Sequence, residues 1–509
     1  MALEVSRSNR EGGTIGNAGP YWGFSEGLTR SYEPCCTSVA HRVTSLSAAN
    51  AEDRRFLGHP LGLGFLVFAE AWERFSYYGM QSLLVLYMGQ QLLLPGHVEH
   101  VAAFDGFRRL ITNLYGPLSP AALASVIFGL YAGGVYLTPI LGGFIADRIL
   151  GRTLTVTVGA CLMALGHFLM AFEASFLPAL GCLLMGVGCF KGNIASQVGE
   201  LYGPDDLRRA DAFQIYLLGV NIAVIVAPLV CGTLGQRVAW HWGFGAAGVG
   251  MLVGLGVYLS GRRWLPPERH ARGEVTVQAP PMNLQDIKAV AVLVAVIPAL
   301  AITALGNQEI FNAYLVWGDA HYDLFFFGKS MPVTWLISLD AIISSGTIIA
   351  AVAFWRWWAT FRSEPGEITK LVVGGLISAL APLLLAMASA QEAATGHKVG
   401  LGWGVAFHIV NDIGYANIFP VGLALFSRAA PKAVAGVMIG VYYLHLFAAN
   451  MGVGWLGGLL EKIGPTRFWM LHAGLVLAGS LALLVVGLLF GRVLTHADHA
   501  NLVAASQEG

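Results

Sequence analysis

The sequence predicts an all-α polytopic membrane protein with twelve transmembrane helices arranged as two bundles of six. Of its 509 residues, 56% are hydrophobic and only 12% are charged, whereas a soluble domain carries about 25% charged residues. Twelve apolar segments are long enough to cross a bilayer. The longest polar interruption, residues 262–286, follows the sixth segment, so it divides the predicted helices into two equal sets.

The predicted spans set the domain boundaries. Residues 1–56 form a polar arm without the apolar h-region of a signal peptide, and we expect this arm to be disordered and cytoplasmic. The N-terminal bundle then covers 57–261, the cytoplasmic linker 262–286, the C-terminal bundle 287–492 and a short tail 493–509. The spans themselves are predicted at 62–90, 119–146, 154–173, 177–200, 211–235, 243–261, 287–317, 332–355, 368–390, 399–427, 433–460 and 469–491.

The distribution of positive charge predicts the orientation in the membrane, because Lys and Arg are enriched in cytoplasmic loops. With the N-terminus inside, the outer loops contain only seven of the 30 Lys and Arg residues, namely Arg108, Arg109, Arg237, Lys329, Lys398, Lys462 and Arg467. We therefore expect a multi-pass protein of the plasma membrane, or of the bacterial inner membrane if the source is prokaryotic, with both termini cytoplasmic.

Composition and motifs also exclude several classes of function. The net charge is zero, which gives no indication of a nucleic-acid partner. The sequence has no HExxH or P-loop pattern, and it has no GxSxG nucleophile elbow or dinucleotide-binding fingerprint at a strand-to-helix turn, which argues against an enzyme and against an ATP-driven pump. We expect no metal or organic cofactor, and we expect the chain to act as a monomer in the lipid bilayer.

The first span carries three ionisable residues in an otherwise apolar run. Glu70, Glu73 and Arg74 share one helical face about 140° wide with Tyr78 and Gln81. A charged side chain at the bilayer centre costs about 2.5–3.5 kcal/mol, so these groups must face one another, a partner or water. Such a stripe is typical of an ion or substrate path, and the alternative is a static ion-pair cluster that holds helices together.

Several motifs resemble those of one transporter family. Residues 142–152, GGFIADRILGR, resemble the loop between helices 2 and 3 of the major facilitator superfamily. Residues 70–79, EAWERFSYYG, resemble the ExxERFxYYG signature of the proton-dependent oligopeptide transporter (POT/PTR) family within it. Further matches follow in order on later helices, at 136–143, 190–193, 211–221, 332–339 and 420–432. By this resemblance the chain is identified as a member of that family.

The resemblance implies a major facilitator fold with a central cavity, which imports di- and tripeptides together with protons by alternating access. The proton is then the coupling ion. The family's proton-coupling positions fall on Glu70, Glu73, Arg74, Lys191 and Glu309. The usual cationic partner of Glu309 lies on helix 1, where this chain has Gln81, so that salt bridge is not available.

The resemblance and the charged face of helix 1 together predict a set of substrate-binding residues. They are Tyr78, Gln81, Tyr136, Lys191 and Asn221. Each has a structural alternative: a lysine that snorkels to the interface, tyrosines of an interfacial belt, and an asparagine that makes an interhelical hydrogen bond.

The chain departs from the family pattern where the peptide amino group is held. The helix 10 glutamate that holds this group falls on Tyr415, which supplies no negative charge at neutral pH. Asp412 lies one turn earlier on the same face, and Asp340 replaces a helix 8 asparagine. We predict that Asp340 or Asp412 contacts a substrate ammonium or takes part in proton coupling. A helix 2 histidine of the family is replaced by Gly129.

These departures leave three functions open. The first is the proton-coupled import of di- and tripeptides. The second keeps the fold and the coupling but moves another small zwitterion or an organic anion, such as a modified amino acid or a peptidomimetic. The third is a nutrient receptor derived from a transporter, which would bind its ligand without moving it.

Overall fold

The computed structural model describes residues 53–203, 206–267, 282–326 and 328–507. Apart from the short antiparallel pair β1 (Phe325–Phe326) and β2 (Lys329–Ser330), these residues form helices and their connections. The predicted arm 1–56 and linker 262–286 lie largely outside the described residues. The predicted tail 493–509 continues the last helix as far as Gln507.

The first group of helices follows the predicted N-terminal spans. α2 packs against α7 and α9, α5 packs against α6 and α9, and α4 packs against α6. The elements are α2 (Leu61–Tyr87), η1 (Met88–Leu92), η2 (Val98–His100), α3 (Phe104–Tyr115), α4 (Pro120–Ile145), η3 (Ala146–Leu150), α5 (Arg152–Leu169), η4 (Glu173–Ser175), α6 (Phe176–Glu200), α7 (Arg208–Ala227), η5 (Pro228–Gly232), α8 (Thr233–Arg237), α9 (Trp240–Gly261) and η6 (Arg262–Trp264).

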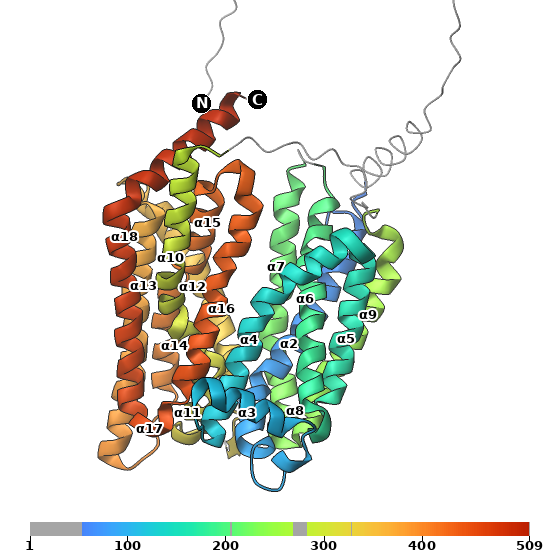
Figure 1. The fold of residues 1–509 in the computed structure, drawn as a ribbon, viewed down its shortest axis with the longest axis vertical. Coiled ribbons are helices and arrows are strands. Elements are labelled where there is room, and N and C mark those ends of the chain that lie inside the picture. Colours follow the sequence, from blue (N-terminus) through green and yellow to red (C-terminus); the bar gives the residue numbers. More distant parts are fainter. Residues whose placement is uncertain (1–52, 204–205, 268–281, 327, 508–509) are drawn as a thin grey trace, which may run out of the picture. The chain divides into compact units, whose positions relative to one another are not determined.

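The second group follows the predicted C-terminal spans and lies beside the first in Figure 1. α18 packs against α10 and α13, while α14 packs against α12 and α13 and α16 packs against α10. The elements are α10 (Leu284–Gln308), η7 (Glu309–Phe311), α11 (Ala313–His321), α12 (Trp335–Trp358), α13 (Glu367–Thr395), α14 (Gly402–Tyr415), α15 (Phe419–Ala429), η8 (Lys432–Val434), α16 (Ala435–Gly457), α17 (Leu460–Ile463) and α18 (Pro465–Gln507).

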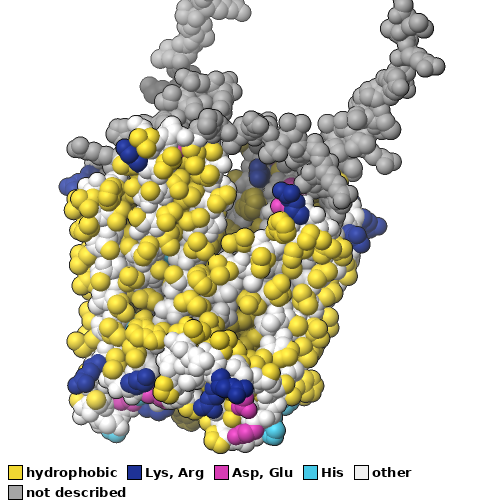
Figure 2. Space-filling model, in the orientation of Figure 1, with side chains coloured by type: hydrophobic (Ala, Val, Ile, Leu, Met, Phe, Trp, Pro, Cys, Tyr) yellow, Lys and Arg dark blue, Asp and Glu magenta, His cyan; other side chains and the backbone are white. Residues whose placement is uncertain are grey.

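Eleven helical segments among the described residues are long and apolar enough to cross a membrane. The twelfth predicted span is α2, which at 27 residues is about 40 Å long, but its charged and polar residues keep it out of this set. Hydrophobic side chains cover the middle of the surface in Figure 2, while Lys, Arg, Asp and Glu gather toward its two ends. This distribution fits a protein surrounded by lipid.

The loop motif at 142–152 holds three helices together. A Cβ atom on Gly142 would lie 1.9 Å from the carbonyl oxygen of Gly188, so only glycine allows α4 and α6 to approach this closely. Gly151 turns the chain with a φ of +78°, which glycine adopts readily. Arg152 then forms ion pairs with Asp147 and with Glu200 at the end of α6.

The start of α2 is fixed by a separate polar cluster. The backbone N–H of Leu61 donates to Asp53 at 3.1 Å, and the guanidinium of Arg55 donates to the same carboxylate. The hydrogen bonds from Arg55 hold the pKa of Asp53 well below its usual range. These contacts fix the position of the first turn of α2, the helix that carries the charged residues.

The two groups of helices touch at the end opposite to the start of α2 and the end of α18. Polar side chains bridge the groups there, in the pairs Gln90–Asp319, Ser119–Glu461, Gln236–Thr334, Thr233–Trp335 and Ser338–Ile225. α4 and α16 also meet at Gly129 and Gly454, which leave no room for a Cβ atom. Figure 2 shows the surface hollowed between the groups toward the other end. The structure is thus closed at the loop end that carries α3 and α17.

Candidate transport site

The three charged residues predicted on helix 1 form one buried cluster on α2. Glu70, Glu73 and Arg74 are 3%, 0% and 4% exposed. Nε of Arg74 lies 3.0 Å from Oε1 of Glu70 and 2.6 Å from Oε2 of Glu73. The cluster contains two carboxylates and one guanidinium, so its ionised form carries one excess negative charge. Both Glu73 oxygens lack a well-aligned hydrogen bond within the described part of the chain.

Lys191 on α6 lies near this cluster without joining it. Its ammonium sits 5.0 Å from the centre of the Tyr136 ring, and no described carboxylate lies within the 4.0 Å of an ion pair. The charges of Lys191 and Glu73 still interact at longer range. Lys191 is half-buried in the middle of α6, so it is not a lysine that snorkels from a helix end. A half-buried cation that has no described carboxylate within ion-pair distance is available to an anionic ligand.

Aromatic residues connect the two groups beside this cation. The Tyr136 ring of α4 stacks on Tyr443 of α16 at 6.5 Å between ring centres. Tyr78 of α2 faces Phe311 of η7 at 6.0 Å. Tyr415 packs beside this layer. These tyrosines therefore lie between the groups of helices and not in a belt at the lipid interface.

Asn221 and Gln81, the two remaining predicted substrate-binding residues of the first group, differ in their exposure. The side chain of Asn221 on α7 is exposed, and no hydrogen bond is found for it among the described residues. Among the described residues, the Asn221 side chain thus makes no interhelical hydrogen bond. Gln81 is 7% exposed, and its side-chain oxygen has no partner in the parts that the structure describes. Gln81 therefore lies behind the surface of the site.

The two predicted aspartates come together in the second group, and a histidine joins them. Nδ1 of His408 lies 2.8 Å from Oδ1 of Asp340, and Nε2 of His408 lies 3.0 Å from the Tyr314 hydroxyl. Asp412 accepts a hydrogen bond from Asn411 at 3.1 Å. Asp340 is the partly exposed member, with 14% of its side chain accessible, while His408 is fully buried.

This cluster has a donor set that a metal ion can use. The ligand atoms of Asp340, His408 and Asp412 lie within 4.8 Å of one another. However, both ring nitrogens of His408 already have hydrogen-bond partners, and a metal ligand must give up one of them. The cluster is better suited to a proton or an ammonium group than to a metal.

Glu309 occupies a different environment from all of these residues. It is fully buried, and its nearest cationic candidate is Nε2 of His472 on α18, 3.7 Å from Oε1. The side chain of Glu309 therefore faces α18.

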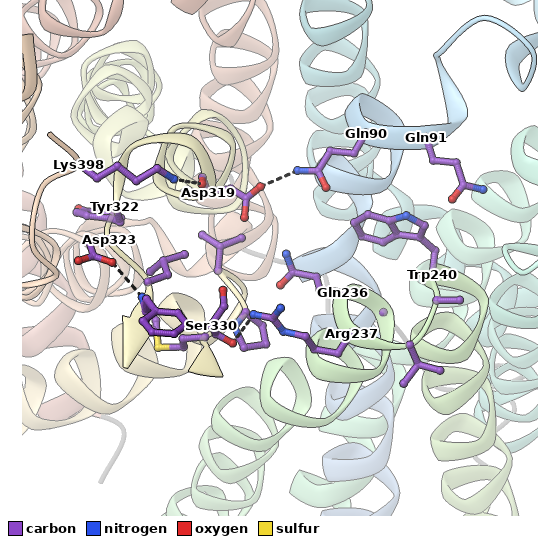
Figure 3. A pocket seen from close by; sticks show the side chains of 18 residues that line it. Gln90, Gln91, Gln236, Arg237, Trp240, Asp319, Tyr322, Asp323, Ser330 and Lys398 are labelled. Carbon is purple, nitrogen blue, oxygen red and sulfur yellow. Dashed lines mark hydrogen bonds between the residues drawn. The ribbon is translucent and has the colours of Figure 1, made fainter. Parts of the chain in front are cut away.

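A pocket of about 640 Å³ lies at the closed end and contains none of the predicted site residues. In Figure 3 the Gln90 amide donates to Asp319 across it, and Arg237 donates to the carbonyl oxygen of Ser330. These bonds join the first group to the second. The pocket is thus part of the contact that closes this end. Glu70, Glu73 and Arg74 do not line it.

Comparison with known proteins gives consistent results. A family model described as the POT family matches residues 153–280. Peptide transporter YePEPT of Yersinia enterocolitica is 27% identical over 85% of this chain and 95% of its own length. A di-/tripeptide transporter of Lactococcus lactis subsp. cremoris is 27% identical over 78% of this chain and 88% of its own length. A mutant of peptide transporter POT crystallised with sulfate superposes with a TM-score of 0.75 at 26% identity, over 88% of this chain and 99% of that one.

The chain is thus similar to proteins of the POT family over most of its length. These similarities confirm the predicted resemblance and the all-helical major facilitator fold, and they place the protein among multi-pass membrane transporters instead of enzymes. The roles of individual site residues stay predictions.

Two histidines next to carboxylates are not among the site residues predicted from the sequence. His408 and His472 each face a buried or half-buried carboxylate. For His408 there was a local signal, because it lies four residues before Asp412 and therefore on the same helical face. For His472 there was none, since its carboxylate is 163 positions earlier in the chain.

Proposed function

We propose that this protein is a proton-coupled symporter that imports di- and tripeptides across the plasma membrane by alternating access, with both termini cytoplasmic. The observation that carries the proposal is the buried cluster of Glu70, Glu73 and Arg74, together with the nearby cation of Lys191, which has no carboxylate within ion-pair distance among the described residues. The peptide-transporter relatives that match most of the chain support it. With the termini inside, the structure is closed to the outside.

Proton and peptide binding are coupled because the two glutamates and the peptide carboxylate compete for the cations Arg74 and Lys191. While both carboxylates are ionised, Arg74 is occupied by Glu70 and Glu73, and Lys191 compensates the excess negative charge at longer range. When a proton binds one carboxylate, that charge is removed and the attraction on Lys191 weakens. A peptide carboxylate then takes the place of the lost charge near Lys191, because a buried cation needs a counter-charge. Proton and peptide binding therefore favour each other.

The two ends of a peptide find opposite charges on the two groups of helices. Lys191 supplies a positive charge on α6, and Asp340 supplies a negative charge on α12, with His408 holding its carboxylate in place at 2.8 Å. We infer that Asp340 replaces the missing helix 10 glutamate as the contact for the peptide ammonium. Asp412 is 1% exposed and lies behind it.

The second candidate is a proton-coupled transporter of another small zwitterion. It is favoured by Tyr415, which stands where the family has a glutamate and packs beside Phe419 at 5.9 Å between ring centres. This aromatic wall narrows the site on the ammonium side. Uptake of single amino acids or peptidomimetics in preference to dipeptides would identify this function, and ligand binding without uptake would identify a receptor.

Replacing Lys191 with glutamine is expected to raise KM for dipeptides by about 10- to 150-fold, because hydrogen bonds to charged groups contribute about 1.5–3 kcal/mol. Uptake into proteoliposomes measures this effect. A dipeptide amide, which has no carboxylate, should be transported with a KM that differs little between wild type and Lys191→Gln. Lys288→Gln, an exposed lysine on α10, serves as the control. An equal loss for the dipeptide and its amide would contradict the assigned contact.

Replacing Asp340 with asparagine is expected to weaken binding of dipeptides with a free amino group by about 10-fold or more, on the same scale of charged hydrogen bonds. The amino-acetylated dipeptide should bind both proteins similarly. Asp412→Asn is the companion variant, and we expect it to alter the pH dependence of uptake more than the affinity. Wild-type uptake and pH response in both variants would remove the Asp340 cluster from the mechanism.

A further inference from the structure

A groove of about 330 Å³ lies between α13, α15 and α18 of the second group of helices. These three helices pack against one another. In Figure 1, α13 and α18 lie on the side of the second group that faces away from the first group. None of the residues predicted for the transport site lines this groove. The groove therefore belongs to the surface that faces the lipid and not to the space between the groups.

The groove lies at the level where three membrane spans end. Glu367 begins one apolar span and Ala429 ends another, while the last predicted span ends at Gly491. All three residues line the groove. Spans that end at one level mark the boundary between the hydrocarbon core and the headgroups. In the proposed orientation, this boundary belongs to the cytoplasmic leaflet.

The floor and the rim of the groove are both apolar. Val372, Leu425 and Leu494 line its floor and are 6%, 5% and 4% exposed, whereas Leu484 and Leu488 line its rim and are 40% and 77% exposed. Exposed leucines within the height of the spans contact lipid chains, because the hydrocarbon core contains no water for them to avoid. The groove therefore offers an acyl chain a concave apolar surface.

Two glycines on one face of α18 keep the groove open. Gly487 and Gly491 are one helical turn apart and both line it. A Cβ atom on Gly487 would lie 2.7 Å from Cγ2 of Ile368, whereas a Cβ atom on Gly491 would meet nothing within 4 Å. A larger side chain at Gly491 would thus enter the open space of the groove without displacing the helices.

The mouth of the groove carries one positive and one negative charge. Arg428 of α15 and Glu367 of α13 form an ion pair there, with 54% and 25% of their side chains exposed. They are the only charged side chains among the described residues that line the groove. A guanidinium group has five N–H donors and a carboxylate has two acceptor oxygens. The exposed pair can therefore accept a ligand that carries both charges, while Arg428 and Glu367 stay in contact.

From this geometry we propose that the groove binds a phospholipid with an ethanolamine headgroup. The lipid phosphate accepts hydrogen bonds from Arg428, and the lipid ammonium donates to Glu367. One acyl chain lies in the groove along Leu484 and Leu488. A choline headgroup has no N–H to donate to Glu367, and a glycerol headgroup leaves the negative phosphate beside Glu367 without a compensating ammonium. The charges at the mouth therefore select the ethanolamine lipid.

Native mass spectrometry of the purified, delipidated protein tests this proposal. The protein is titrated with phosphatidylethanolamine, phosphatidylcholine and phosphatidylglycerol of identical acyl chains. Wild type should bind the ethanolamine lipid about 10-fold or more tightly than the choline lipid, on the scale of hydrogen bonds to charged groups. Glu367→Gln should lose most of this preference. Gly491→Leu should lose the site for all three lipids, and the difference from wild type separates this site from other lipid contacts.

Gly474→Leu is the matched control, because Gly474 lies on the same helix, does not line the groove and would also meet nothing within 4 Å through a Cβ atom. This variant should bind lipid as wild type does. Equal binding of the three lipids by wild type, tighter binding of phosphatidylglycerol, or unchanged binding in Gly491→Leu would overturn the proposal. A wild-type dimer that Gly491→Leu dissociates would show that the groove holds a second copy of the chain instead.

Thermal unfolding in detergent gives a second readout, because a ligand that binds the folded protein raises its Tm. Added phosphatidylethanolamine should raise the Tm of wild type and Gly474→Leu more than that of Glu367→Gln. The same rise in all three proteins would contradict the proposed headgroup contact. If Gly491→Leu does not fold, the comparison of wild type with Glu367→Gln still decides the headgroup preference. Neither measurement depends on transport, so both are independent of the proposed symport.

Discussion

Replacing Arg74 with methionine is expected to abolish proton-driven uptake and to lower the free energy of unfolding by about 3–5 kcal/mol. The variant keeps two carboxylates, Glu70 and Glu73, in a site where both are buried and where Arg74 is their shared partner. Removing one member of a buried ion pair leaves an uncompensated charge, which costs more than the pair contributed. Unfolding in detergent and uptake into proteoliposomes measure the two effects separately.

A neutral triple variant separates stability from function. Glu70→Gln, Glu73→Gln and Arg74→Met together remove all three charges, so we expect most of the lost stability to return while uptake stays absent. Arg74→Lys keeps the charge but not the forked geometry of arginine, and it should lie between wild type and Arg74→Met in both assays. A stable and active Arg74→Met protein would show that the cluster is not required.

Replacing Gly129 with leucine is expected to prevent closure of the outer end and to reduce uptake by about 5- to 150-fold, because overpacking costs about 1–3 kcal/mol in the closed form. A Cβ atom at this position would lie 2.5 Å from the carbonyl oxygen of Asn450 and 2.6 Å from Cα of Gly454. We expect the open form to lose this contact, so the protein should remain open to the outside in the proposed orientation.

Accessibility to an impermeant thiol reagent measures this shift. Ser125 lies in the same contact and is 4% exposed, so Ser125→Cys in a background without native cysteines should react from outside only when Gly129→Leu is present. Gly245→Leu on α9 is the control, because a Cβ atom there meets nothing within 4 Å. Equal labelling with and without Gly129→Leu would contradict the assigned outer closure.

The same contact bears on a departure from the family pattern. The family histidine is replaced here by Gly129, and the sequence alone shows only that a proton acceptor is missing. In the structure α4 and α16 approach too closely at this point for any side chain. A histidine at position 129 would therefore not fit this closed contact.

The features that could be predicted from the sequence are those that depend on residues close together along one helix. The spans were predictable because each must satisfy its own backbone hydrogen bonds in lipid, and the grouping of Glu70, Glu73 and Arg74 followed from helical spacing. The pairing of Asp340 with His408, and of Glu309 with His472, could not be predicted in this way. These partners lie on different helices, and only tertiary packing brings them together.

We propose that proton movement drives peptide uptake through the Glu70–Glu73–Arg74 cluster. Uptake of labelled alanyl-alanine into proteoliposomes, with and without an inwardly directed proton gradient, tests this coupling in wild type and Glu73→Gln. We predict that wild type accumulates the dipeptide only with the gradient, while Glu73→Gln exchanges dipeptide across the membrane but does not accumulate it. Wild-type uptake that ignores the gradient, or accumulation by Glu73→Gln equal to wild type, would contradict the claim.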